Sequence, residues 1–273
     1  MLFRERLVKR VPPEIRALVR RKSPSAGWFD DSVPDWDTAT AESDGYDSPE
    51  ILERVMAGTQ TVLAGEAAFE RDSAVFTSRE YSWPLVSALC LAAAQAGGCL
   101  RVLDFGGSLG STFFQHRLIL DQLRSVSWTV VEQPHFVKAG TDLMPDGPLY
   151  FREDLETSLQ EVQPNIVLFG SSLQYLPEPA ATLDLVAGSS TSILLLDRLP
   201  VWQEKSSKVA IQKVPKHIYE ASYPTWIFSE LELRRLLERD WYVGANYDCL
   251  GGSLRTKRGL RVDWRGFLCW RDT

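Results

Sequence analysis

Acidic and small residues follow apolar stretches at five places in the 273-residue chain, and residues of these types can bind a polar ligand. If each apolar stretch is a strand of a parallel sheet, these residues meet at one edge, where such sheets bind ligands. Four carboxylates at one edge are more than folding requires, so we expect a binding site there. The five positions are Asp104, Glu132, Asp154, Gly170-Ser171 and Asp197.

A glycine-rich turn follows the first of these stretches. Residues 101–110 read Arg-Val-Leu-Asp-Phe-Gly-Gly-Ser-Leu-Gly, and a helix-compatible stretch begins directly afterwards. Glycine lets the backbone approach a ligand closely, and the start of a helix offers unpaired N–H groups. Asp104 would repel a pyrophosphate but suits an ammonium group, which S-adenosylmethionine (SAM) carries in its amino-acid part. An ordinary strand-to-helix turn remains the alternative interpretation.

Strands and helices alternate around this turn, which predicts a parallel sheet with helices on both faces. We therefore predict an α/β fold: a Rossmann-like, doubly wound, mostly parallel seven-stranded sheet with an antiparallel C-terminal edge and an N-terminal helical extension. Parallel strands are expected at 101–105, 128–131, 149–151, 165–169 and 192–196, and the edge strands at 241–249 and 266–270. Helices are expected at 49–65, 82–97, 112–124, 135–141, 155–161, 179–187 and 229–239, with Ser229 as the cap of the last one.

Three stretches of the sequence carry a family resemblance. They read Val-Leu-Asp-Phe-Gly-Gly-Ser-Leu-Gly, Trp-Thr-Val-Val-Glu-Gln-Pro and Leu-Phe-Gly-Ser-Ser-Leu-Gln-Tyr-Leu. They resemble the class I SAM-dependent methyltransferases, and in particular a methyltransferase family associated with bacterial surface-polysaccharide biosynthesis. The class I pattern covers residues 85–273, and the closer likeness extends back to Gly45-Tyr46-Asp47.

The resemblance implies a role for each matching residue. Asp104 would lie near the amino group of SAM, Glu132 would accept hydrogen bonds from both ribose hydroxyls beside Gln133, and Asp154 with Leu155 would contact adenine. Ser108 departs from the commonest class I motif, which has glycine there, and adds a side chain close to the cofactor. The residues that would surround the methionine part are Gly106, Gly107, Ser108, Gly110, Gly170 and Ser171.

Methyl transfer to an alcohol benefits from a general base, because the acceptor hydroxyl has a high pKa. His217 is the leading candidate, since it lies in the insertion 216–226, where class I enzymes often bind acceptors. Asp197 is the next candidate, either as base or as the orienting partner of His217. A surface or structural role for His217 stays open, and His116 and His135 are expected to be structural. Four aromatic residues could stack on a sugar or simply pack the insertion: Trp202, Trp226, Tyr219 and Tyr223.

Charge is distributed unevenly along the chain. Residues 1–22 hold eight Lys/Arg against Glu5 and Glu14, which leaves 22 basic and 34 acidic residues in the remainder, a net charge of −12. Such an acidic body argues against nucleic-acid binding. The basic segment could contact an anionic membrane surface peripherally, or it could be a solvated helix that caps the domain.

Cysteine usage and hydropathy indicate a cytoplasmic protein. Four cysteines without a CxxC pair are expected to be buried thiols, and no metal site is expected. No stretch has the pattern of a signal peptide, and the longest apolar run, 85–94, is about half as long as a bilayer requires. The cysteines are Cys90, Cys99, Cys249 and Cys269.

We expect two regions in the chain. Residues 1–84 would form a helical and irregular extension that covers the active-site cleft, and residues 85–273 would form the methyltransferase domain. The extension holds Trp28, Phe29, Trp36 and Tyr46, which are too many large rings to leave in water, so it should fold back on the domain.

The predicted function is SAM-dependent O-methylation of a sugar or carrier-linked saccharide in polysaccharide biosynthesis. One alternative is a non-catalytic protein that binds SAM or a nucleoside within a biosynthetic assembly. A nicotinamide-dependent oxidoreductase is a third option, which Asp104 and the lack of a suitably placed Tyr-xxx-Lys pair weaken.

Overall fold

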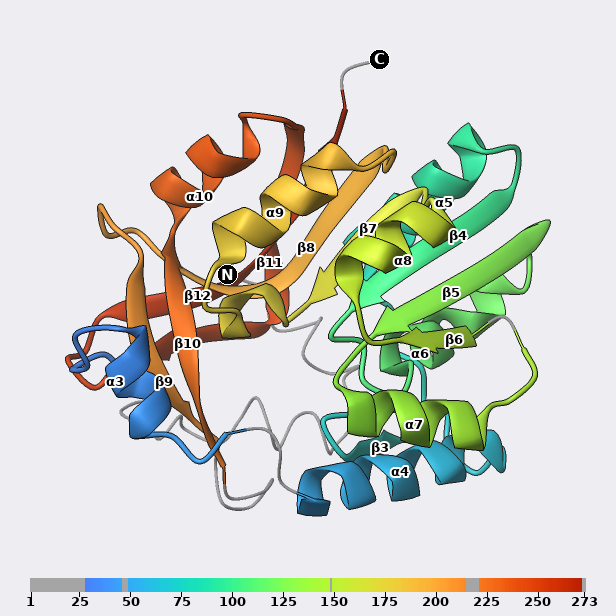
Figure 1. Cartoon of the computed structure of the whole chain (residues 1–273), viewed down its shortest axis with the longest axis horizontal. Coiled ribbons are helices and arrows are strands. Elements are labelled where there is room, and N and C mark those ends of the chain that lie inside the picture. Colours follow the sequence, from blue (N-terminus) through green and yellow to red (C-terminus); the bar gives the residue numbers. More distant parts are fainter. Residues whose placement is uncertain (1–27, 46–48, 148, 215–220, 272–273) are drawn as a thin grey trace, which may run out of the picture.

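The computed structural model describes residues 28–45, 49–147, 149–214 and 221–271, which form a curved sheet flanked by helices (Figure 1). The strands are β1 (Phe29–Asp30), β2 (Phe69–Arg71), β3 (Ala74–Phe76), β4 (Cys99–Phe105), β5 (Ser125–Val131), β6 (Leu149–Arg152), β7 (Ile166–Gly170), β8 (Ile193–Trp202), β9 (Lys208–Lys213), β10 (Ser222–Ser229), β11 (Tyr242–Arg255) and β12 (Arg261–Trp270). The helices are α3 (Trp36–Ala41), α4 (Pro49–Leu63), α5 (Trp83–Gln95), α6 (Ser111–Leu120), α7 (Pro134–Leu143), α8 (Leu155–Val162), the short 3-10 helix η2 (Leu173–Tyr175), α9 (Pro179–Gly188) and α10 (Glu230–Leu237).

The predicted seven-stranded arrangement is present and runs in the order β11-β12-β8-β7-β4-β5-β6. Strands β4 to β8 are parallel to one another, and β11 and β12 form the antiparallel edge. The chain first builds β4, β5 and β6 outward on one side, and then returns to place β7 and β8 on the other side of β4. This reversal confirms the doubly wound topology, in which the ligand site lies beside the first strand.

The register of the parallel strands aligns their carboxyl ends. Phe105 of β4 is level with Val131 of β5 and with Phe169 of β7, while Gly170 is level with Asp197 of β8. The residues after each strand therefore emerge at one edge of the sheet, which we call the carboxyl edge. This is the arrangement that the spacing of the acidic residues predicted.

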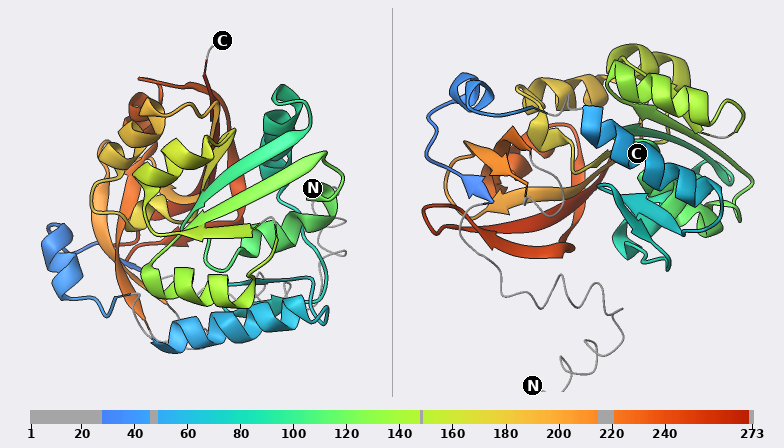
Figure 2. Two further views of the ribbon diagram at one scale, coloured as in Figure 1. Left: turned by 45° about the vertical axis from the view of Figure 1, so that its right-hand side comes forward. Right: turned by 90° about the horizontal axis from the view of Figure 1, so that it is seen from below.

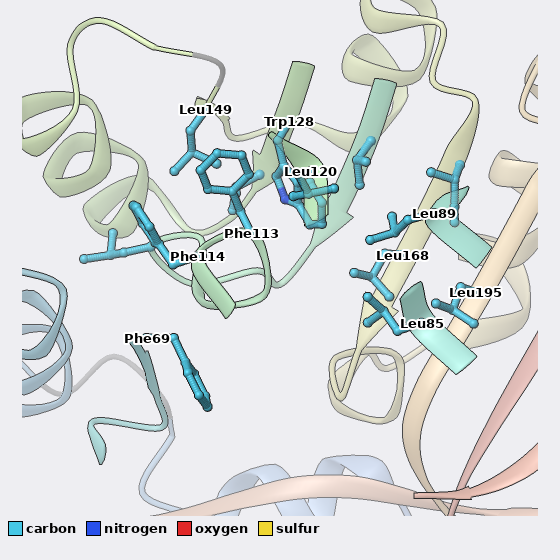
Figure 3. Packing of buried hydrophobic residues seen from close by; sticks show 14 of the residues in the cluster. Phe69, Leu85, Leu89, Phe113, Phe114, Leu120, Trp128, Leu149, Leu168 and Leu195 are labelled. Atoms are coloured by element: carbon cyan, nitrogen blue, oxygen red, sulfur yellow. The ribbon is translucent and has the colours of Figure 1, made fainter. Parts of the chain in front are cut away.

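Both faces of the parallel strands are buried, because neighbouring residues of one strand point to opposite faces. Val102 enters a core with α4, α5, α6 and α7, whereas Leu103 enters the core under α8, α9 and α10. Figure 3 shows the first core, where Phe113 of α6 lies beside Trp128 of β5 with ring centroids 5.7 Å apart. This double burial explains the near-continuous apolar strands in the sequence.

The main sheet has ten strands in the described residues, because β10, β9 and β1 extend it beyond β8. The final residues of β8 pair with β10, which continues antiparallel to β9, and Phe29 of β1 pairs with Gln212 of β9. The sequence analysis predicted an insertion at 216–226 and an irregular segment around Phe29, and no strand in either. It missed β1 because its partner β9 is distant in the chain, whereas β9 and β10 follow each other directly, with Lys213 paired to Ser222, and were not predicted.

The segment before β2 packs in two places, as the views in Figures 1 and 2 show. Helix α3 lies against β9 and β10, while α4 lies along α7. Trp36 of α3 stacks on Trp226 at 6.0 Å, and Phe29 is fully buried near Trp264. The large rings thus fold back as expected. Tyr46 and residues 1–22 lie outside the described residues, and the boundary at residue 84 stays a prediction.

Helix starts follow the expected capping chemistry. The Ser229 side chain accepts a hydrogen bond from the Glu232 N–H at 3.4 Å at the start of α10, as predicted. Of the four thiols expected to be buried, Cys269 is buried but Cys90 is exposed. Within the described ranges no helix combines the length and apolar character needed to cross a membrane.

Candidate functional site

The loop between β4 and α6 requires glycine at two positions. Gly106 has φ +69°, and a Cβ there would lie 2.5 Å from Ser172 Cβ. Gly110, the residue before α6, has φ +89°, and its Cβ would lie 2.7 Å from a methyl carbon of Leu149. Because the backbone is left-handed and the neighbouring atoms are this close, any residue other than glycine would be strained at these two positions. The glycines therefore shape a narrow loop at the start of a helix, where N–H groups are available to a ligand.

Glu132 ties this loop to the end of the neighbouring strand. The Ser108 N–H donates to Glu132 Oε1 and the Gln133 N–H donates to Oε2, both at 3.0 Å. Burial raises the pKa of Glu132, and the two N–H donors and His135 partly oppose this effect. Each carboxylate oxygen can accept a second hydrogen bond. Glu132 is thus oriented, and it can still accept two hydroxyl groups.

Ser108 occupies the position where the commonest motif has glycine, and it adopts a glycine-like conformation with φ 54°. A residue with a side chain is uncommon in this region of backbone space. Ser108 therefore adopts a conformation that glycine would adopt without strain, at the cost of local strain.

Asp104 lies beneath the loop and is 1% exposed. Its Oδ2 accepts a hydrogen bond from Trp128 Nε1 at 3.1 Å, while Oδ1 has no hydrogen-bond partner among the described residues. A Cβ on Gly107 would lie 2.6 Å from Oδ2. Burial raises the pKa of Asp104 to about 7, against the opposing effects of Trp128 and Arg198. A positive charge in the loop would favour the ionised carboxylate.

The side chains of the other predicted cofactor residues differ in whether they are exposed or buried in the core. Asp154 is exposed and caps α8, because its Oδ1 accepts from the Thr157 N–H at 2.7 Å. The Leu155 side chain is buried in the core under α8, so only its backbone is left for an adenine contact. Gly170 ends β7 at the carboxyl edge and Ser171 follows it, and the Ser171 N–H donates to the Asp197 carbonyl at 2.8 Å.

Asp197 lies at an irregularity in β8. The pairing with β12 shifts there, so that Asp197 and Arg198 together face Gly266, and Arg198 has φ 57°. Such a bulge bends the strand and redirects side chains that would otherwise alternate between faces. The Arg198 Nε lies 3.6 Å from Asp197 Oδ2, so the two charged groups form an ion pair.

Asp197 is also held by the edge strand β11. Its Oδ1 accepts from the Tyr247 hydroxyl at 2.8 Å and contacts Cys249 Sγ at 3.5 Å. Tyr247 reaches Asp197 across Gly266, where a Cβ would lie 2.1 Å from the tyrosine ring. Burial and Asp197 raise the pKa of Tyr247, so the phenol keeps its proton. These contacts fit Asp197 as an orienting group, and its predicted partner His217 lies outside the described residues.

Two of the aromatic residues that could have stacked on a sugar are used for packing. Trp226 stacks on Trp36 and donates its Nε1–H to the Leu176 carbonyl at 3.1 Å. Trp202 is buried, and its Nε1–H donates to the Ser206 carbonyl at 3.0 Å. The packing interpretation therefore holds for these two rings. Tyr219 lies outside the described residues.

A hairpin missed by the sequence analysis brings two further charged residues to the carboxyl edge. In β2, Glu70 accepts from Ser111 Oγ at 2.8 Å and from the Ser73 N–H at 2.7 Å, which joins the hairpin to the start of α6. Burial raises the pKa of Glu70 to about 7. Arg71 donates to Gln115 of α6. Polar turn residues between two short apolar stretches were the signal that could have revealed this hairpin.

His116 has the structural role expected of it. It is 1% exposed, and its Nδ1 lies 2.8 Å from the Thr112 carbonyl oxygen, one turn earlier in α6. Burial lowers its pKa to about 4, so the ring is neutral at pH 7. A neutral ring places no further positive charge beside the nearby arginines.

No protein-family model and no curated protein matches the chain. Solved structures that resemble it include the N-terminal domain of EvdMO1 with S-adenosylhomocysteine (SAH) and D-fucose, at 14% identity and a TM-score of 0.49, covering 83% of this chain and 100% of that one. A second is the 1,6-didemethyltoxoflavin-N1-methyltransferase of Burkholderia thailandensis, at 14% identity and a TM-score of 0.44, covering 85% and 95%. A third is the glycopeptide N-methyltransferase MtfA with SAM, at 12% identity and a TM-score of 0.44, covering 68% and 94%. At these values the likenesses carry no argument about the activity of this chain.

Proposed function

We propose that the chain is a SAM-dependent methyltransferase. The observation that carries this proposal is the buried Asp104 beneath a glycine loop, with one carboxylate oxygen unpaired among the described residues. Glu132 adds a second carboxylate at the end of the adjacent strand, oriented by two N–H groups. An ammonium group and a pair of ribose hydroxyls are the ligand groups that such a pair recognises.

The cofactor would lie along the carboxyl edge from β6 to β4. The loop from Gly106 to Gly110 would surround its methionine part, Glu132 and Gln133 its ribose, and Asp154 with the Leu155 backbone its adenine. Gly170 and Ser171 would border the methionine part on the other side. The Gln133 side-chain oxygen is buried and unpaired in the described structure, so it too is available to a donor.

The bound cofactor supplies an electrophilic methyl group on a sulfonium. The chain must then align the acceptor, exclude water and remove the acceptor proton. We assign the proton removal to His217, with Asp197 as its orienting partner, because Tyr247 and Arg198 already hold the Asp197 carboxylate in place. The acceptor hydroxyl of a sugar or carrier-linked saccharide is proposed from the sequence resemblance.

Titration calorimetry with SAH tests the cofactor assignment. The wild-type chain should bind SAH, and Glu132→Ala should weaken binding about tenfold or more, because a charged hydrogen bond contributes about 1.5–3 kcal/mol. Glu132→Gln keeps the size of the side chain and should also weaken binding. Glu53→Ala, an exposed residue of α4, is the matched control and should bind as wild type does. Absence of wild-type binding, or equal affinity for all four proteins, would refute the proposal.

A further inference from the structure

Two arginines from different parts of the chain lie near the start of α6 at the carboxyl edge. Arg71 donates to Gln115 of α6, and a Cβ on Gly170 would lie 3.3 Å from Arg198 Nη2 and 4.0 Å from Thr112 Oγ1 of the same helix. Arg71 comes from the hairpin before the main sheet, and Arg198 comes from the bulge in β8. Burial lowers the pKa of Arg71 to about 10, and Arg198 is the nearby charge that contributes most to this effect. Two guanidinium groups placed together repel each other, so their proximity requires an explanation.

Each arginine is held in position by contacts with uncharged groups, which for Arg198 add to its ion pair with Asp197. Arg71 donates to Gln115, whose amide donates in turn to the Glu80 carbonyl, and its guanidinium lies over the Phe69 ring at 5.5 Å. Arg198 Nη2 donates to the Gly170 carbonyl at 3.0 Å. Because a guanidinium has five N–H donors, both groups keep donors for a further partner.

One of these remaining donors, the Nε–H of Arg198, is unused. It is buried and makes no hydrogen bond within the described part of the chain, and its nearest anionic contact is Asp197 Oδ2 at 3.6 Å. The bulge therefore aims a cation at the carboxyl edge and leaves one of its donors unsatisfied. An unsatisfied buried donor costs free energy unless a ligand fills it.

Asp72, Asp197 and Glu80 lie close enough to Arg71 to raise its pKa, but no ion pair among the described residues joins Arg71 to a carboxylate. Asp197 forms the ion pair with Arg198, but it also accepts from Tyr247 and contacts Cys249. Glu70, next to Arg71 in the sequence, has a pKa of about 7 and is partly protonated at neutral pH. Arg71 thus keeps donors that no carboxylate of the described residues pairs with, and an anion that reaches both guanidinium groups would bind to unused donors on each.

The position of β8 indicates which molecule carries this anion. The residues assigned to SAM follow β4, β5, β6 and β7, whereas β8 is the next strand beyond β7. Two strand spacings place β8 about 10 Å from β4. Because Arg198 also donates to the Gly170 carbonyl, it lies beside the methionine end of the proposed cofactor, at the border of the space left for the acceptor.

We propose that Arg71 and Arg198 form a subsite for a phosphate or carboxylate group of the methyl acceptor. This inference rests on the proposed function, and it narrows the acceptor class to anionic compounds, such as a saccharide that carries a phosphate. The planar guanidinium groups match the oxygens of such anions.

Titration of inorganic phosphate into the full chain, both free and saturated with SAH, tests the subsite. The wild type should bind phosphate in both states, and Arg71→Gln and Arg198→Gln should each weaken binding about tenfold or more. Arg198→Lys keeps the charge but loses the planar fork, so it should also weaken binding. The matched control is Arg117→Gln on α6, whose side chain is 51% exposed, and it should bind as wild type does. Thermal unfolding of each variant checks that it is folded.

Three results would overturn the subsite. These are no phosphate binding by the wild type, equal affinity in the folded arginine variants and the control, or loss of phosphate binding on saturation with SAH. The last result would assign the arginines to the carboxylate of the cofactor instead. Failure of the proposed function is seen separately as absence of SAH binding, because titration of the free protein does not depend on the cofactor.

Discussion

Replacing Asp104 with asparagine should change how the stability of the free protein depends on pH. The pKa of Asp104 is about 7 in the folded chain against 3.8 for an ordinary aspartate, chiefly because of burial. Above pH 3.8 the unfolded chain releases this proton, whereas the folded chain holds it until about pH 7. Stability that the raised pKa provides at low pH is therefore lost as the pH rises towards and through 7.

The size of the effect follows from the two pKa values. A pKa difference of about three corresponds to roughly 4 kcal/mol in total, of which roughly 2 to 3 kcal/mol falls between pH 5 and pH 8. Asp104→Asn cannot ionise, and its carbonyl can still accept the hydrogen bond from Trp128. The stability of the variant relative to wild type should therefore rise by that amount from pH 5 to pH 8, even if the variant is less stable at pH 5.

Urea denaturation of both proteins without cofactor, at several pH values from 5 to 8, measures this difference. Asp35→Asn is the control, because Asp35 is exposed and the Thr38 N–H lowers its pKa, which places its titration below this range. Its stability relative to wild type should not change with pH. If the free energies of unfolding of Asp104→Asn and wild type differ by the same amount at every pH in this range, Asp104 is not a buried carboxyl group with a raised pKa, and the reasoning is refuted.

Two further substitutions test the packing of the site. Gly107→Ala should lower the free energy of unfolding by about 1–3 kcal/mol, because its Cβ would lie 2.6 Å from Asp104 Oδ2. The control is Gly147→Ala, where a Cβ meets no described atom within 4 Å, and it should change the free energy of unfolding by less than about 0.5 kcal/mol in the same urea titrations. Tyr247→Phe should lower stability by about 1–2 kcal/mol, because Asp197 loses a 2.8 Å hydrogen bond, and an unchanged urea midpoint would contradict that contact.

The sequence predicted those parts of the fold that depend on local pattern. Apolar runs located β4 to β8, and the pair Ser229 and Glu232 located the start of α10, because strand burial and helix capping act over a few residues. Strand β1 was missed because Phe29 pairs with Gln212, far along the chain. Pairings of this kind leave little trace in either segment alone.

Some residues of the candidate site could likewise be predicted from local sequence pattern, and others could not. Asp104 and Glu132 could be recognised because each follows a strand directly, and the structure brings both to the glycine loop. Arg71 and Tyr247 could not be recognised from the sequence. Arg71 reaches this edge because the hairpin packs on α6, and Tyr247 reaches it because its side chain crosses Gly266. Leu155 shows the reverse case, where the strand-end position is right but the side chain turns into the core.

Strained backbone is concentrated at the carboxyl edge, which supports the view that this edge is the functional one. Six residues other than glycine have positive φ in the described structure, and Gln163, at the end of α8, is an ordinary helix terminus. Asp72 and Ser73 form the two-residue turn between β2 and β3, where positive φ is ordinary for a tight hairpin. The remaining three, Ser108, Ser171 and Arg198, lie in the glycine loop, after β7 and in the β8 bulge, at a cost of about 1–3 kcal/mol each. Folding alone gives no reason to collect this strain at one edge, whereas a site that must hold its groups ready for a ligand does.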